Sequence, residues 1–367
     1  MGKAGWLRGV ASGLLFASTS LACSDEGDGS GGGGGGSDTA NGASTNAATG
    51  SINASSGSSG STAATTATSS SGNGGGAPGV DDPNLDGPYT FDEVDASTTS
   101  PSGNMVPIHA AFPTGGPTAG PYPVIVVAHG FQLPASQYTS YVQRLASHGF
   151  VALTADYPAS FIGVNNVENA QDLIAALDWA ASASELGGAA DASTAGMTGH
   201  SMGGKLALLA ATMDDRVQAA ITLDPVDGAM SCSPQDCPDV SNLMPLDIPT
   251  GFLGETLDAM GGFMACAPAA DNYTTFYAGT TAPSLSVTVL GANHMSFLDD
   301  VASCGFTCSF CNAATLDNAT VNALSRAFVV AFYRRYLRGE TAYDAFLTGA
   351  DAQARYVDTG LAAIESK

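Results

Sequence analysis

A serine within a glycine-rich segment is the first residue of this chain with a clear chemical use. Gly199, Ser201 and Gly203 fit the pattern Gly-x-Ser-x-Gly, and another glycine follows. Residues 192–198, which precede the motif, are read as a short buried strand, and residues 205–212, which follow it, as a helix. A serine on a tight turn between a strand and a helix exposes its hydroxyl to a substrate, and small neighbours let the turn close. We therefore predict that Ser201 is a nucleophile.

A base must accompany this serine, because a serine hydroxyl is a weak nucleophile on its own. In serine hydrolases whose nucleophile lies on such a strand-to-helix turn, the acid and then the histidine follow the serine in the chain. The chain has five histidines, and only His294 lies after Ser201. His294 also stands just after a predicted strand. We predict that His294 is the base and that His200, within the serine motif, points away from the serine.

Four carboxylates are candidates for the acid that orients the base. Asp224 and Asp227 follow one predicted strand, and Glu255 and Asp258 follow the next. Asp224 lies closest to the end of its strand. Aspartates that cap turns are common, so these positions alone leave the acid open.

Two backbone N–H groups are expected to bind the negative oxygen that forms when a carbonyl is attacked. One belongs to Met202, the residue after the serine. The other belongs to Phe131, which follows the His129-Gly130 turn after a central strand. This chemistry needs no cofactor, and we expect none. Apolar candidates for an acyl or alcohol pocket are Phe131, Phe161, Met202, Met295 and Phe297.

Alternating strands and helices must position these residues. The predicted strands are 122–128, 150–154, 192–198, 217–223, 248–253 and 284–290. The predicted helices are 137–147, 166–183, 205–212 and 321–337, and antiparallel edge strands are expected within 89–113. This order predicts an α/β fold, with a mostly parallel central sheet and helices on both faces. Such sheets bind ligands at the carboxyl ends of their strands, where each motif falls.

The N-terminal segments are predicted to lie outside this fold. Residues 1–23 read as a signal peptide, with a positive start followed by a short apolar stretch. Cys23 ends a segment that resembles a bacterial lipobox, although Ser20 stands where a branched residue is usual. Lipid attachment at Cys23 and ordinary secretion therefore both stay open. Residues 24–80 lack aromatic, lysine and arginine residues, which predicts a disordered linker, and 81–367 is the predicted catalytic domain.

Charge and cysteine content also bear on partners and compartment. The formal net charge of −23 argues against binding to nucleic acid or to anionic lipid surfaces. Six cysteines follow Cys23, and they fit three disulfides in an exported protein. The spacing of Cys304, Cys308 and Cys311 leaves a metal-binding knuckle as an alternative.

The motifs together resemble the chlorophyllase branch of the α/β-hydrolases. That wider group includes bacterial cutinase-like polyester hydrolases, dienelactone-hydrolase-like proteins and platelet-activating-factor acetylhydrolases. The segments that carry the resemblance are 129–131, 146–151, 199–205, 223–228, 266–277 and 294–300. The resemblance spans residues 105–340. It implies an α/β-hydrolase fold and ester hydrolysis.

The resemblance also favours one acid. Chlorophyllases and the acetylhydrolases use the position that corresponds to Asp224, whereas polyester hydrolases use one near Asp258. The Asp-Pro-Val-Asp-Gly segment that starts at Asp224 favours the first. Met202 stands where plant members usually have arginine, so chlorophyll itself is not implied as the substrate.

We therefore expect an exported serine hydrolase that cleaves carboxylic esters through an acyl-enzyme. Its catalytic residues are predicted to be Ser201, His294 and Asp224. The expected substrate is an ester of a small molecule, a lipid or a polyester. The protein is expected at the surface of a bacterial-type cell or in the surrounding medium. The alternatives are a thioesterase, peptidase or acyltransferase on the same fold, or a surface-binding protein without catalysis.

Overall fold

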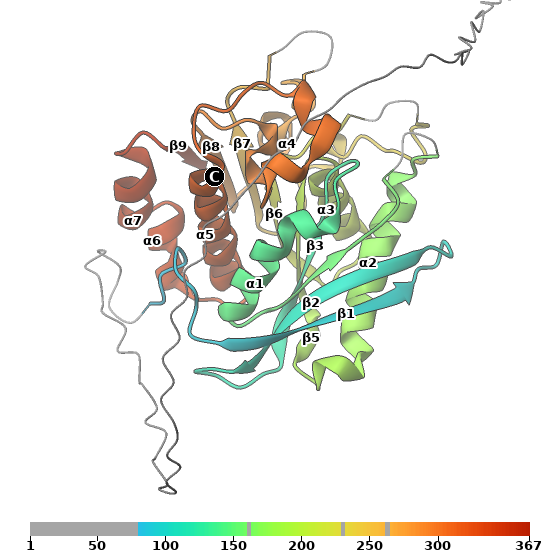
Figure 1. The fold of residues 1–367 in the computed structure, drawn as a ribbon. Coiled ribbons are helices and arrows are strands. Elements are labelled where there is room, and N and C mark those ends of the chain that lie inside the picture. The colour runs from blue at the N-terminus through green and yellow to red at the C-terminus, as the bar shows by residue number, and fades with distance from the viewer. Residues whose placement is uncertain (1–79, 160–162, 229–231, 261–264) are drawn as a thin grey trace, which may run out of the picture. The chain divides into compact units, whose positions relative to one another are not determined.

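The computed structural model describes residues 80–159, 163–228, 232–260 and 265–367 (Figure 1). The predicted signal peptide, Cys23 and Phe161 lie outside the described residues, as does the predicted linker except for its last residue. The described part confirms the predicted fold class, since it is a mostly parallel sheet surrounded by helices.

Nine strands form one sheet in the order β1-β2-β4-β3-β5-β6-β7-β8-β9. The central strands from β4 to β8 pair in parallel, and antiparallel partners complete both edges. The strands are β1 (Thr90–Thr99), β2 (Met105–Gly115), β3 (Tyr122–Ala128), β4 (Val151–Ala155), β5 (Ala190–His200), β6 (Val217–Leu223), β7 (Thr250–Glu255), β8 (Ser284–Val289) and β9 (Ala362–Ser366).

Helices cover both faces of the sheet. They are α1 (Thr139–Ser147), α2 (Asn166–Ser182), α3 (Met202–Met213), α4 (Tyr273–Gly279), α5 (Asn318–Tyr336), α6 (Asp344–Leu347) and α7 (Ala350–Ala352). Side chains of a strand alternate between faces, so Ile125 and Val127 pack with α1 and α5 while Val124 and Val126 pack with α2 and α3. Two apolar cores result. Within the described residues, no helix combines the length and apolar character needed to cross a membrane.

The predicted strand limits agree with the structure for some strands and differ for others. β3 and β6 have the predicted limits, whereas β7 starts two residues later than predicted. Proline has no N–H to contribute to a sheet, and β7 begins directly after Pro249. The sequence analysis missed β9, because its half-exposed residues form no continuous apolar run.

The parallel strands place the predicted site at one end of the sheet. Ser201 follows β5, Asp224 follows β6, Asp258 follows β7 by three residues, and His294 follows β8 by five. Since β5, β6, β7 and β8 are consecutive neighbours in the sheet, their carboxyl ends lie along one edge. Residues separated by up to 93 positions in the chain therefore meet there.

Candidate active site

Ser201 occupies a tight turn between β5 and α3. Its φ of 56° and ψ of −124° lie outside the regions that residues with side chains prefer. Such backbone strain persists where the surroundings enforce it, and it is concentrated at functional sites. A side chain at Gly199 would put its Cβ 2.2 Å from the Gly203 carbonyl oxygen. A Cβ at Gly203 would lie 2.4 Å from the Ala128 carbonyl oxygen, so both glycines are sterically required.

His294 connects the serine to a carboxylate. Its Nε2 lies 2.8 Å from the Oγ of Ser201, and its Nδ1 lies 2.6 Å from Oδ2 of Asp224. His294 is 3% exposed and Asp224 is fully buried. The structure thus brings together the three residues that the sequence analysis selected as nucleophile, base and acid.

The partners of the imidazole determine its hydrogen positions. A carboxylate only accepts hydrogen bonds, so Nδ1 carries a hydrogen and donates it to Asp224. In the neutral ring, Nε2 then accepts the hydroxyl hydrogen of Ser201. Burial raises the pKa of Asp224, although the hydrogen bond from His294 lowers it in part.

Asp258, the alternative acid, contacts the same histidine at a different place. Its Oδ2 accepts a hydrogen bond of 2.8 Å from the backbone N–H of His294. Its Oδ1 accepts one of 2.7 Å from the backbone N–H of Asn312. Asp258 therefore joins the segments that follow β7 and β8. The imidazole ring itself is contacted by Asp224.

The two remaining carboxylates have other partners. Asp227 lies 2.8 Å from Nζ of Lys205, and both side chains are almost fully buried. Lys205 belongs to α3, so this ion pair ties the start of that helix to the segment after Asp224. Glu255 accepts backbone N–H groups from Leu257 and Asp258. Burial and the nearby charge of Asp224 raise the pKa of Glu255 to about 7.

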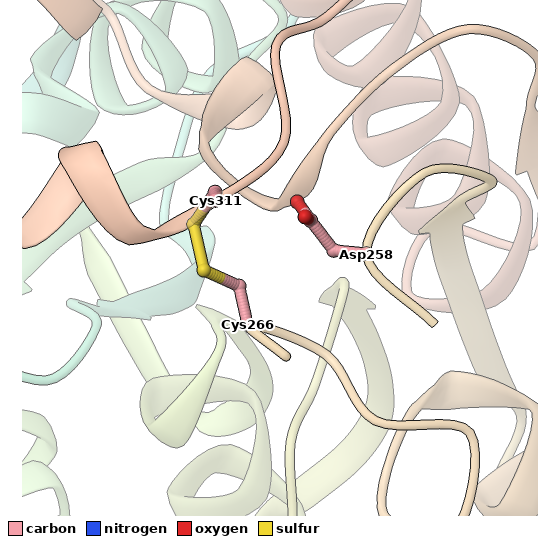
Figure 2. A group of neighbouring side chains, drawn as sticks. All are labelled: Asp258, Cys266 and Cys311. Atoms are coloured by element: carbon pink, nitrogen blue, oxygen red, sulfur yellow. A yellow bond between two sulfur atoms is a disulfide. The ribbon is translucent and has the colours of Figure 1, made fainter. Parts of the chain in front are cut away.

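A disulfide lies beside Asp258. Figure 2 shows the Cys266–Cys311 bond next to the Asp258 carboxylate. The sulfur and oxygen atoms of these three residues are close enough to one another to suggest a metal site. The two sulfur atoms are bonded to each other, and both carboxylate oxygens accept backbone N–H groups. The group is therefore a structural junction between two loops.

The other described cysteines are paired as well. Cys232 bonds to Cys237, and Cys304 bonds to Cys308. The alternative of a metal knuckle formed by Cys304, Cys308 and Cys311 is wrong, because Cys311 is bonded to Cys266. The expectation of three disulfides is confirmed.

The loop that was expected to supply an oxyanion donor packs against the serine turn. A Cβ added at Gly130 would lie 3.4 Å from Cβ of Ser201. The preceding residue, His129, is buried and stacks on Tyr157 with ring centroids 3.9 Å apart. Met202 is the first residue of α3, and the first N–H groups of a helix have no acceptor within it.

The predicted pocket residues differ in their surroundings. Met202 and Met295 are 7% and 5% exposed, and they pack into the two different apolar cores. Phe131 is partly buried against the core that contains Met202. Phe297 is fully buried, with its ring 6.0 Å from that of His200, so it is a core residue.

Two residues near the site have contacts that the sequence analysis did not anticipate. Both ring nitrogens of His200 contact groups other than the serine hydroxyl, and its Nε2 lies 2.8 Å from the backbone oxygen of His294. Tyr138 contacts the other nitrogen of His200 at 2.8 Å. Tyr138 precedes His200 by 62 positions, and no motif in the sequence marks it.

A groove of about 650 Å³ lies at the opposite end of the sheet. Its lining comes from 112–116, 118–122 and 186–189 and includes Tyr122, the first residue of β3. Ser201 lies near the carboxyl end of this strand, so the groove is separate from the candidate active site.

Comparisons with known proteins identify the family of this chain. The chlorophyllase family model matches residues 86–356. Chlorophyllase-1 of Arabidopsis thaliana is 28% identical over 271 residues, covering 68% of this chain and 81% of the relative. The bis(hydroxyethyl) terephthalate hydrolase of Streptomyces coelicolor is 28% identical over 264 residues, covering 72% of each. Chlorophyllase-2 of Arabidopsis thaliana is 27% identical over 241 residues, covering 60% of this chain and 75% of the relative. This chain belongs to the chlorophyllase family and is an ester hydrolase with the α/β-hydrolase fold.

Proposed function

We propose that this protein is an exported serine esterase that cleaves carboxylic esters through an acyl-enzyme. Ser201 is the nucleophile, His294 the general base and acid, and Asp224 the residue that orients the imidazole. The observation that carries this proposal is the position of His294, 2.8 Å from the serine oxygen and 2.6 Å from the aspartate. These contacts match the arrangement that activates a serine hydroxyl.

The first half of the reaction forms the acyl-enzyme. The Oγ of Ser201 attacks the ester carbonyl carbon while its hydrogen moves to Nε2 of His294. The resulting imidazolium is stabilised by Asp224, which keeps its negative charge. The N–H groups of Phe131 and Met202 stabilise the oxygen anion. The carbon–oxygen bond to the alcohol then breaks, and His294 gives its hydrogen to the leaving oxygen.

The second half releases the acid. Water attacks the acyl carbon while His294 removes one of its hydrogens, and the same N–H groups stabilise the second oxygen anion. The bond to Ser201 breaks and its oxygen takes the hydrogen back from His294. The free carboxylic acid leaves, and the starting enzyme is restored.

We place the substrate among small-molecule, lipid and polyester esters. The named activities of the relatives support an ester bond as the target and leave the alcohol and acyl groups open. We propose that Phe131, Met202 and Met295 contact the acyl or alcohol group. Met202 and Met295 directly follow the nucleophile and the base in the chain, and Phe131 directly follows Gly130, which packs against Ser201.

We further propose that residues 1–23 direct export and that 24–80 form a linker before the catalytic domain. Three disulfides support this proposal, because such bonds form and persist in oxidising compartments. Mass spectrometry of the protein from its native host tests it. A mature chain that starts at a lipid-modified Cys23 indicates a cell-surface lipoprotein, cleavage without lipid indicates secretion, and an intact 1–23 overturns the proposal.

Substitution of the serine tests the catalytic assignment. Ser201→Ala should lower kcat on p-nitrophenyl esters by roughly 10³–10⁶-fold and abolish labelling by a fluorophosphonate. The matched control is Ser325→Ala, which removes a serine hydroxyl that is buried and donates within α5. Retained turnover or labelling in Ser201→Ala would overturn the assignment. A parallel panel of amide and thioester substrates tests whether ester hydrolysis is the preferred reaction.

A further inference from the structure

Two buried polar side chains beside the candidate site have no role in the proposed reaction. Tyr138 and His200 are both fully buried. Tyr138 ends the short 3-10 turn before α1, and His200 is the last residue of β5. Burying such groups costs free energy unless they are hydrogen-bonded, so their partners identify what they hold in place.

These partners form a continuous series of three hydrogen bonds. The N–H of Gly130 donates to the Tyr138 hydroxyl at 3.2 Å, and that hydroxyl lies 2.8 Å from Nδ1 of His200. On the other side of the ring, Nε2 lies 2.8 Å from the backbone oxygen of His294. The series begins in the loop before Phe131 and ends at the proposed base.

Only one direction of donation satisfies all three contacts with neutral side chains. The carbonyl of His294 only accepts, so Nε2 of His200 carries the hydrogen. Nδ1 is then an acceptor, and the Tyr138 hydroxyl donates to it while accepting from Gly130. Burial lowers the pKa of His200 well below its ordinary value and thereby keeps the ring neutral.

We propose that Tyr138 and His200 are positioning residues. They hold three parts of the site in fixed relative positions: the oxyanion loop (residues 129–131), the turn at Ser201 and the base His294. This inference rests on the proposed roles of Ser201, His294 and Phe131. His200 is covalently joined to Ser201, and Tyr138 contacts the residue before Phe131. One hydroxyl group thus fixes the proposed oxyanion donor relative to the nucleophile and the base.

The effect of this series should fall on the chemical step. Oxyanion donors act mainly on the transition state, because the negative charge develops only there. Loss of such a donor costs roughly 10²–10³-fold in kcat. Tyr138→Phe keeps the donor and loosens its position, so we expect a smaller loss in kcat, about 10-fold to 100-fold, with KM about unchanged.

The test compares Tyr138→Phe with a matched removal of another buried hydroxyl. Tyr333 is also fully buried, and its hydroxyl lies 2.7 Å from Oγ1 of Thr198 in β5. Thermal unfolding measures what each variant costs in stability. Tyr138→Phe should lower kcat and weaken binding of a phosphonate transition-state analogue in parallel, whereas Tyr333→Phe should leave kcat about unchanged. The proposal is overturned if the two variants have equal kcat values, or if Tyr138→Phe raises KM and leaves kcat unchanged.

His200 provides a second, graded comparison. His200→Gln keeps one donor and one acceptor, while His200→Leu keeps neither. We expect the glutamine variant to retain more kcat than the leucine variant at comparable stability, and the reverse order contradicts the proposal. Ser201→Ala separates the two hypotheses. An inactive Ser201→Ala with a fully active Tyr138→Phe refutes only the positioning role, whereas an active Ser201→Ala refutes the proposed function itself.

Discussion

Two carboxylates contact His294 at different places, and exchanging each for its amide separates their roles. Asp224 contacts Nδ1 of the ring, and Asp258 accepts the backbone N–H of the same residue. Asp224→Asn and Asp258→Asn both remove one negative charge with little change in shape. We expect the first to act on catalysis and the second mainly on stability.

The magnitudes follow from these contacts. Asp224→Asn removes the charge that stabilises the imidazolium, which in comparable triads costs about 10⁴-fold in kcat, or about 5.5 kcal/mol. Its effect on folding should be small or stabilising, since burial disfavours the ionised form of Asp224. Asp258→Asn breaks one of two hydrogen bonds to a charged acceptor, worth roughly 1.5–3 kcal/mol of unfolding free energy.

Steady-state kinetics on a p-nitrophenyl ester and urea unfolding at pH 7 measure both effects on the same samples. The expected result is a crossed pattern. Asp224→Asn loses turnover and keeps stability, and Asp258→Asn loses stability with about a tenfold lower kcat. If Asp258→Asn loses as much kcat as Asp224→Asn, or Asp224→Asn loses less than about tenfold, the assignment of the acid is refuted.

Two further predictions concern stability. The pKa of Glu255 is raised to about 7 from an ordinary value of 4.5. The protonated side chain therefore contributes stability that is fully present below pH 4.5 and is lost as pH rises through 7. The loss in unfolding free energy is about 3 kcal/mol. Urea unfolding at pH 5 and pH 8 should show this decline in the wild type and a flatter profile in Glu255→Gln, and equal slopes would contradict the prediction. Replacing Cys266 and Cys311 together by serine removes a disulfide that joins residues 45 positions apart, and chain entropy predicts a loss of about 4 kcal/mol in unfolding free energy. The same replacement of Cys232 and Cys237, which are 5 positions apart, should cost about 2 kcal/mol. Unfolding free energies of the two double variants test this order, and a larger loss for the shorter loop would be inconsistent with it.

Local patterns in the sequence were sufficient for several parts of this protein. The limits of β3 (Tyr122–Ala128) follow from a continuous apolar run, because strands buried on both faces contain little else. The limits of β6 (Val217–Leu223) were also predicted, from a segment in which polar residues are few. The tight turn at Ser201 was predicted from Gly199 and Gly203, because a close connection between a strand and a helix leaves no room for larger side chains there. His294 was selected by elimination, since no other histidine follows the serine.

The spacing of the carboxylates left the acid open and a family resemblance favoured Asp224, but the contact with the imidazole is seen only in the tertiary structure. Asp224 and Asp258 follow neighbouring strands and both reach His294, one at the ring and the other at the backbone. Residue type and spacing do not distinguish these two contacts, because both need a carboxylate at the same edge of the sheet. The contact between Tyr138 and His200 also depends on how α1 and its preceding turn pack against β5. A sequence pattern records the periodicity of single elements, whereas the distance between side chains on different elements is set by how those elements pack.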